Sequence, residues 1–272
     1  MNFFKTLEII LQSSSVEEKI EKFNDFYRAY RDGDTHFEED FTPKEFDTPS
    51  YAKICKIVAP QVVPKRKNIV TDEGKITFIH AIAHIEYSAI DLALDAAYRY
   101  RGLPKSYYDD WLEVADDEVR HFKMLEKILK QLGGFYGELE VHNALFEASQ
   151  RTAHSFLDRM AVVPRYLEAN GLDATPQILQ KLKRLPQDKL LKEIIEALEV
   201  IVDEEIEHVL KGDRWFEYAC KKEGVDKSIY FEIIQKYYPN TFEKKRVLNT
   251  KGRLEAGFTC KELETIASEK VC

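Results

Sequence analysis

The sequence is poor in the residues that interrupt helices. Its 272 residues include only 11 glycines and 9 prolines. So few breaks in a chain of this length favour long helices over a fold of many short strands and turns. The hydrophobic share of 44% and the charged share of 32% are ordinary for a globular protein and exclude a mainly disordered chain.

Cysteine is also scarce, and the cysteines that are present stand far apart. They are Cys55, Cys220, Cys260 and Cys272. No two of them form a CxxC pair, which argues against a sequence-local zinc knuckle or redox pair. We therefore expect free thiols and a cytoplasmic location, where thiols stay reduced.

Long apolar runs and an excess of positive charge are missing too. No stretch approaches the roughly 18 apolar residues of a membrane-spanning helix. Lys5 and Glu8 interrupt the apolar start and no cleavage site follows, so we expect an amphipathic helix there and no membrane partner. The net charge of -8 argues against nucleic acid as a partner, with a modified RNA as the remaining alternative.

What the sequence does have is strong helical periodicity in its middle part, residues 71–222. Four long periodic stretches follow one another there, separated by glycine and proline breaks. They cover 73–101, 105–132, 143–169 and 187–222. We therefore predict an all-α fold with a four-helix bundle, in which the connection 133–142 crosses the length of the bundle.

The two ends of the chain differ from this middle part. Residues 1–70 begin with helical periodicity over 1–31 and continue as an extended segment that we expect to wrap around the rest. Residues 223–272 predict a helix near 226–238 and then an irregular tail. We expect both ends to be extensions of the bundle within one structural domain.

Each of the four predicted bundle helices carries a glutamate within an apolar stripe at helical spacing. In the second and the fourth helix, a histidine follows three residues later and so shares the same face. The six residues are Glu86, Glu118, His121, Glu168, Glu205 and His208. A lone carboxylate in a core costs several kcal/mol unless something pairs with it, so these positions need an explanation.

Two glutamates and two Glu-x-x-His pairs are the ligand set of di-iron and di-manganese carboxylate bundles. Four carboxylates balance two divalent cations, and oxygen and imidazole ligands suit iron, manganese or zinc. We predict two divalent ions at these six residues, with iron as the first choice and manganese or a mixed Fe/Mn pair as alternatives. The competing interpretation is a metal-free layer of Glu–His and Glu–Arg pairs.

Residues near the predicted ligands suggest how the site is supported. Asp117 and Glu204 precede the two motif glutamates and are candidates to accept a hydrogen bond from a ligating imidazole, unless they face solvent. Pro164, one turn before Glu168, predicts a kink or bulge. We interpret His84 and the residues that share its face of the first helix as a solvent or rim face.

Several segments resemble a ferritin-like bacterial family, domain of unknown function 455. They read HAIAHIE (80–86), AIDLALD (89–95), YDDWL (108–112), DDEVRHF (116–122), RTAH (151–154), PRYLEANGLD (164–173) and RWF (214–216). The likeness runs from about Pro60 to Phe258. It implies a ferritin-like bundle with the same six residues as matching ligand positions. Glu204 departs from the pattern, which usually has Asp there.

The function that these observations favour is an O2- or peroxide-dependent oxidoreductase acting on a small-molecule substrate with an external electron donor. The alternative is iron binding, storage or detoxification. The long segments on both sides of the bundle would obstruct the shell that storage needs. A third interpretation is a structural protein that its metals only stabilise. The chain could act as a homodimer.

Overall fold

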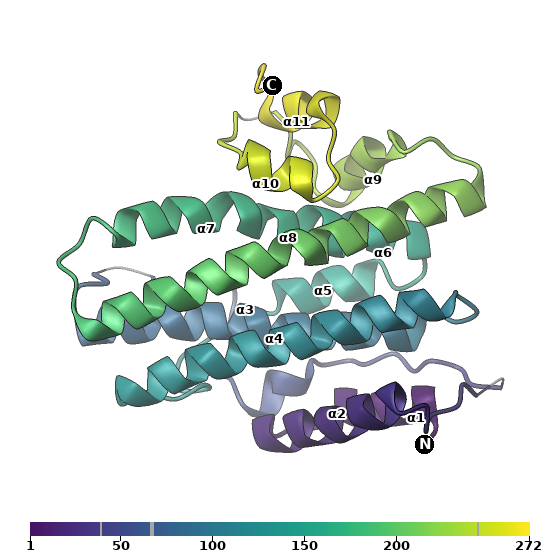
Figure 1. The fold of residues 1–272 in the computed structure, drawn as a ribbon, viewed down its shortest axis with the longest axis horizontal. Coiled ribbons are helices and arrows are strands. Elements are labelled where there is room, and N and C mark those ends of the chain that lie inside the picture. The colour runs from purple at the N-terminus through teal and green to yellow at the C-terminus, as the bar shows by residue number, and fades with distance from the viewer. Residues whose placement is uncertain (39, 66–67, 244) are drawn as a thin grey trace. The chain divides into compact units, whose positions relative to one another are not determined.

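The computed structural model is all-helical, as predicted (Figure 1). It describes residues 1–38, 40–65, 68–243 and 245–272. In these ranges the only β-pairing is two isolated bridges, Asn2 with His36 and Ile57 with Val141. The chain divides into two compact units, residues 1–147 and residues 148–272, called unit 1 and unit 2 below.

Unit 1 is built around a pair of long helices, α3 and α4, that pack along each other (Figure 1). Its elements are α1 (Phe3–Leu11), α2 (Val16–Arg31), the 3-10 helix η1 (Ser50–Lys53), α3 (Asp72–Arg99) and α4 (Lys105–Gln131), while α5 (Ala144–Arg151) spans the border between the units. The start of α3 is fixed by Thr71, whose hydroxyl accepts from the Gly74 N–H at 3.1 Å. The two long helices agree with the predicted ones.

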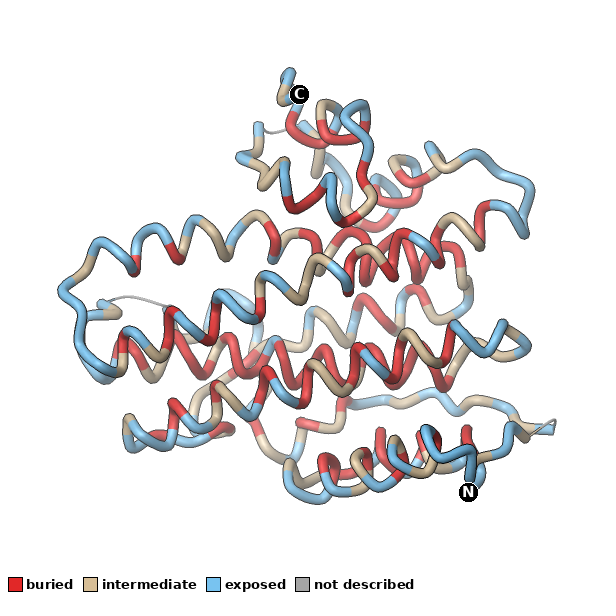
Figure 2. The backbone as a smooth tube through the Cα atoms, viewed as in Figure 1, coloured by how far each residue is buried: buried red, intermediate tan, exposed pale blue. Residues whose placement is uncertain are grey.

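The N-terminal segment covers the face of α3 that we expected to meet solvent. Lys19 of α2 donates to Asp91 of α3 and, at 2.6 Å, to the Ser50 hydroxyl. The Lys44 N–H donates to the Tyr98 hydroxyl at 2.7 Å. The N-terminal segment thus packs against α3, and its wrapping of the bundle stays a prediction. The predicted solvent face is wrong because His84 is only 6% exposed. Figure 2 shows buried residues along the length of α3.

Unit 2 consists of two helical paths and three short helices. The first path runs through α6 (Phe156–Val162), the π-helix η2 (Val163–Glu168) and α7 (Ala169–Leu182), and the second is α8 (Lys189–Glu223). α6, η2 and α7 all pack against α8. The short helices are α9 (Ile229–Tyr237), α10 (Thr250–Glu255) and α11 (Cys260–Ala267).

The third predicted helix, 143–169, begins where predicted but is wrong in its middle and at its end. α5 ends at Arg151, and α6 begins directly after Ser155. The Ser155 hydroxyl caps α6 by accepting from the Asp158 N–H at 3.0 Å. The path then continues through Gly171 to Leu182. A glycine costs a helix interior about 1 kcal/mol, and the burial of Leu172 and Leu179 outweighs that cost.

The predicted break near Pro164 is confirmed as η2. Proline has no N–H for the helix ladder, and its ring pushes the preceding turn outward, which a π-helix accommodates. The neighbouring residue of α8 is Gly212, where an added Cβ would lie only 2.5 Å from the Pro164 Cβ. The absence of a side chain at Gly212 therefore lets α8 approach η2 closely.

The C-terminal region is more ordered than predicted. Instead of an irregular tail it forms α10 and α11, and a disulfide joins Cys260 to Cys272. The expectation of free thiols is therefore wrong for these two cysteines and confirmed for Cys55 and Cys220, which are free and buried. α11 turns the chain so that the Cα atoms of Cys260 and Cys272 lie 5.8 Å apart. Among the described residues, no helix has both the length and the apolar character that crossing a bilayer requires.

Candidate metal centre

The facing sides of α3 and α4 bring three of the predicted ligands together in unit 1. They are Glu86 of α3 and Glu118 and His121 of α4, called the unit 1 cluster below. One donor atom from each lies within 4.8 Å of the other two. His121 Nδ1 is 3.3 Å from Glu86 Oε2 and 3.5 Å from Glu118 Oε2. The i, i+3 spacing on α4 produces the second distance, and the packing of α3 on α4 produces the first.

The unit 1 cluster is buried and strongly charged. Glu86 is 5% exposed, Glu118 1% and His121 0%. Burial alone lowers the pKa of His121, but hydrogen bonding and the charges of Glu118 and Glu86 outweigh it and raise that pKa to about 11. A positive charge between these carboxylates is therefore strongly favoured, and a divalent cation would supply it.

Unit 2 repeats half of this pattern on α8. His208 Nδ1 lies 3.4 Å from Glu205 Oε1, again at i, i+3 spacing. His208 is fully buried, and the Glu205 side chain is 14% exposed. Glu168 is the last residue of η2 and is partly buried. These three residues are called the unit 2 set below. That the unit 2 set and the unit 1 cluster form one metal site stays a prediction.

The donor chemistry fits a divalent metal ion. The unit 1 cluster offers carboxylate oxygens and an imidazole nitrogen, which suit iron, manganese or zinc better than metals that prefer thiolates. Its two carboxylates match the double charge of such an ion. A buried Glu/His cluster that could hold a metal ion is thus present among the described residues.

The predicted supporting residues, Asp117 and Glu204, are both partly exposed. Asp117 Oδ1 accepts from Arg120 Nη2 at 2.6 Å on the same helix. Each oxygen of a carboxylate can accept more than one hydrogen bond. A hydrogen bond from a ligating imidazole to Asp117 or Glu204 therefore remains a prediction.

Sequence reasoning missed a buried polar pair in unit 1, formed by His84 of α3 and Tyr136. His84 Nε2 lies 2.9 Å from the His142 carbonyl oxygen, which only accepts, so Nε2 carries the proton. His84 Nδ1 then accepts from the Tyr136 hydroxyl at 3.0 Å. The Tyr136 ring lies 5.1 Å from that of Phe122, the residue after His121. Helical periodicity gives no signal for this contact, because Tyr136 stands in a loop.

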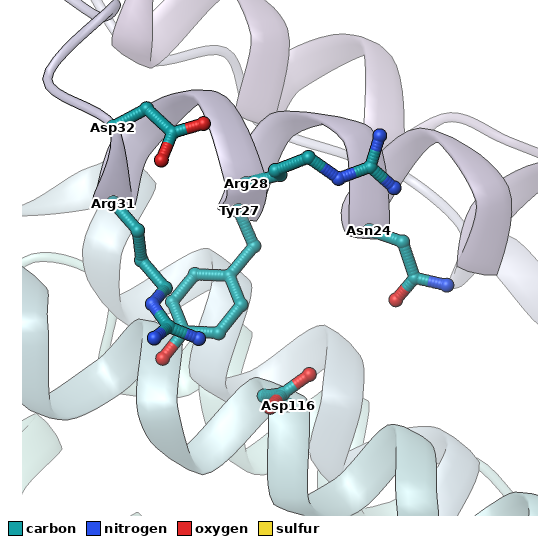
Figure 3. Close-up of a pocket in the computed structure, with 6 residues that line it drawn as sticks. All are labelled: Asn24, Tyr27, Arg28, Arg31, Asp32 and Asp116. Carbon is teal, nitrogen blue, oxygen red and sulfur yellow. The ribbon is translucent and has the colours of Figure 1, made fainter.

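A separate groove lies between α2 and α4 in unit 1. It has a volume of about 340 Å³ and is lined by Asn24, Tyr27, Arg28, Arg31, Asp32 and Asp116. Figure 3 shows Tyr27 and Arg31 extending from α2 toward Asp116 of α4. Burial and the nearby Asp117 raise the pKa of Asp116. Two arginines and two aspartates cancel in charge, so this groove would not strongly attract an ion of either sign.

Comparison with known proteins identifies relatives of the chain. The family model described as "Protein of unknown function (DUF455)" matches residues 12–264. An "Uncharacterized protein" of Haemophilus influenzae is 38% identical over 276 residues, which cover 97% of this chain and 93% of that protein. No solved structure matches the chain. The family expected from the sequence motifs is therefore confirmed.

Proposed function

The chain belongs to the DUF455 family, and from that premise we propose that it is a ferritin-like dinuclear metal protein. In this proposal, the α3–α4 pair joins the two helical paths of unit 2 in a four-helix bundle. The unit 1 cluster and the unit 2 set then hold two divalent ions, iron first and manganese or a mixed pair as alternatives. The reaction is an O2- or peroxide-dependent oxidation of a small molecule.

The observation that carries this proposal is the unit 1 cluster. Two carboxylates and an imidazole are buried at one point with donor atoms within 4.8 Å of one another. Burying charges in this way costs several kcal/mol, so a function that needs them is the simplest explanation. The second Glu-x-x-His pair, Glu205 with His208, supports a second ion because the same ligand pattern recurs on α8.

The chain's own residues define what such a site does. Glu86 and Glu118 bind and neutralise the cations, and His121 contributes a neutral nitrogen once its proton has left. Val114 and Leu125, about one turn on either side of these ligands on α4, are 1% and 0% exposed and keep water out. Bound ferrous ions would supply electrons for the reduction of O2 or peroxide.

The partners follow from this chemistry. A small-molecule substrate and an external electron donor complete the reaction, and the protein acts as a monomer or a homodimer. We propose a cytoplasmic location on the basis of the buried free thiols of Cys55 and Cys220. The Cys260–Cys272 disulfide argues in the opposite direction, because disulfides are rare in the cytoplasm. Thiol titration of protein taken directly from a lysate decides which state exists there.

The test of the metal site is metal analysis of anaerobically purified protein and its variants. We expect about two ions per chain in the wild type, as in other carboxylate bundles. Glu118→Ala and Glu205→Ala should each lower that content well below the wild-type value. Matched controls are Glu113→Ala and Glu207→Ala, which remove exposed glutamates from the same two helices. Full occupancy in both ligand variants would contradict the site.

The test of the reaction class is O2 consumption by the reduced, metal-loaded protein. Continued consumption with a chemical reductant, at a stable metal content, supports the oxidoreductase. Accumulation of many ions per chain in a large shell would instead support iron storage and overturn the enzyme proposal. If bound metal raises the unfolding temperature but the protein neither consumes O2 nor accumulates ions, the metal has a structural role only.

A further inference from the structure

The segment that carries Glu168 contains a fully buried arginine. Arg165 stands in η2, three residues before Glu168, and its side chain is 0% exposed. Its Nε donates to Asp213 Oδ1 of α8 at 2.5 Å, and its Nη2 donates to Glu262 Oε1 of α11 at 2.7 Å. One side chain of η2 is thus bonded to two other helices of unit 2.

Aromatic rings and a second cation complete the surroundings of Arg165. The guanidinium carbon lies 4.2 Å from the centre of the Tyr230 ring and 4.3 Å from that of Phe258. Lys227 donates to the other oxygen of Asp213 at 2.7 Å, so the charges in this cluster balance. A buried charge with this many partners is held in one position, because any shift would leave a charge uncompensated.

Glu262 links Arg165 to the start of α11. Its Oε2 accepts from the N–H of Thr259 at 2.8 Å, while the Thr259 hydroxyl caps the helix in return. Its other oxygen, Oε1, is the one that accepts from Arg165. The carboxylate that closes the capping box of α11 is therefore also the partner of η2, and the two structures depend on each other.

A second arginine holds the chain on the other side of Glu168. Arg253 of α10 donates to the carbonyl oxygen of Ala169, the residue after Glu168, at 3.1 Å. It also bonds Asp173 of α7 at 2.7 Å, and it is only 2% exposed. The backbone that presents Glu168 is thus anchored before it by Arg165 and after it by Arg253.

We propose that these contacts form a clamp whose role is to position Glu168 for metal binding. The clamp consists of Arg165, Asp213, Glu262, Arg253 and Asp173. A π-helix is rare and less favourable than an α-helix, so its surroundings must hold it in place. The C-terminal helices α10 and α11 supply two of the five clamp residues. The inference rests on the proposed metal site, and it assigns these helices a function in that site.

The first test measures the clamp directly. We expect Glu262→Gln, which removes the charge but keeps the shape, to increase backbone hydrogen exchange in residues 163–170 and to leave α4 unchanged. The control is Glu255→Gln, which changes an exposed glutamate of α10. Asp173→Asn is a milder second variant in case Glu262→Gln fails to fold. Unchanged exchange in 163–170 would overturn the clamp.

The second test asks whether the clamp acts through Glu168. Removing groups that orient metal ligands typically weakens metal binding by about 10–100-fold, and we expect a loss near tenfold for Glu262→Gln. In a Glu168→Ala background the same change should cause no further loss. A loss of equal size in both backgrounds would overturn the positioning role. A wild type that binds no metal would overturn the proposed function, while the exchange result would still decide whether the clamp exists.

Discussion

The Glu-x-x-His pairs of the two units look alike in sequence but stand in different settings. In unit 1, Glu118 and His121 face Glu86 from regular α-helices, and all three residues are at most 5% exposed. In unit 2, Glu205 and His208 also lie in a regular helix, but Glu168 ends a π-helix that distant residues hold. Helical spacing and the packing of two regular helices therefore determine the geometry of the first set, whereas the position of Glu168 in the second set also depends on residues far away in the sequence.

The largest effect is expected from Glu118→Ala, whose comparison with Glu168→Ala tests whether the two sets are equally important for metal binding. Glu118→Ala removes a 1% exposed member of the unit 1 cluster. We expect its metal affinity to fall by at least about 100-fold, at the upper end of the losses seen when a site is disturbed. Glu168→Ala leaves the unit 1 cluster intact, so its metal affinity should fall by a smaller factor. Equilibrium dialysis with Mn²⁺ measures the affinity of both variants. Equal losses would show that the two sets of residues contribute equally to metal binding.

The next prediction concerns acid, and it separates the units through their tryptophans. The chain has two, Trp111 in unit 1 and Trp215 in unit 2, so Trp215→Phe leaves one reporter, which lies in unit 1. His80 of α3 accepts from the Gly137 N–H at 3.0 Å, and burial lowers its pKa to about 4. In the unfolded chain, His80 has an ordinary histidine pKa of about 6.5. Between about pH 4 and pH 6.5, His80 is therefore protonated in the unfolded chain but not in the folded one.

It follows that unit 1 loses stability as the pH falls from about 6.5 to 4, by about 3 kcal/mol for His80. Above that interval both states are neutral at this residue and the stability stays level. Urea unfolding followed by Trp111 fluorescence measures the slope. His80→Gln keeps an acceptor for Gly137 and should remove about half of this pH dependence, because burial also lowers the pKa of His84 to about 4. A variant with an unchanged slope would show that His80 does not contribute to it.

Helical spacing and the chemistry of proline explain which parts of the fold and of the candidate site could be predicted. The i, i+3 rule places Glu118 beside His121 and Glu205 beside His208 whatever surrounds them. The break at Pro164 likewise follows from the missing N–H of one residue. The residues that we predicted from such rules are the ones whose positions depend on their own helix.

What could not be predicted depends on contacts between distant residues. Arg165 and Glu262 are 97 positions apart, and nothing in either segment marks them as partners. The covered face of α3 was misread because polar residues such as Asp91 look solvent-exposed until Lys19 is placed against them. The start of α6 at Ser155 is a single cap within a continuous helical pattern, so periodicity did not reveal it.

A smaller effect tests how closely η2 depends on its surroundings. Gly212→Ala would bring a Cβ to 2.5 Å from the Pro164 Cβ, which real contacts do not tolerate. We expect the π-helix to shift and the stability of unit 2 to fall by about 2 kcal/mol, within the range of overpacked cores. Unfolding followed by Trp215 in a Trp111→Phe background measures it. Unchanged stability would mean that η2 adapts freely and needs no clamp.

The smallest effect has the opposite sign and comes from the same kind of substitution at Gly171, three residues after the end of η2. Gly171 lies inside α7, and a Cβ added there meets no atom within 4 Å. Alanine is the better helix former, so Gly171→Ala should stabilise unit 2 by about 0.4–1 kcal/mol, mainly by restricting the unfolded chain. The same Trp215 measurement applies. If Gly171→Ala stabilises unit 2 and Gly212→Ala destabilises it, the tight packing is limited to the side of η2 that faces α8. If both substitutions destabilise unit 2, the tight packing extends into α7.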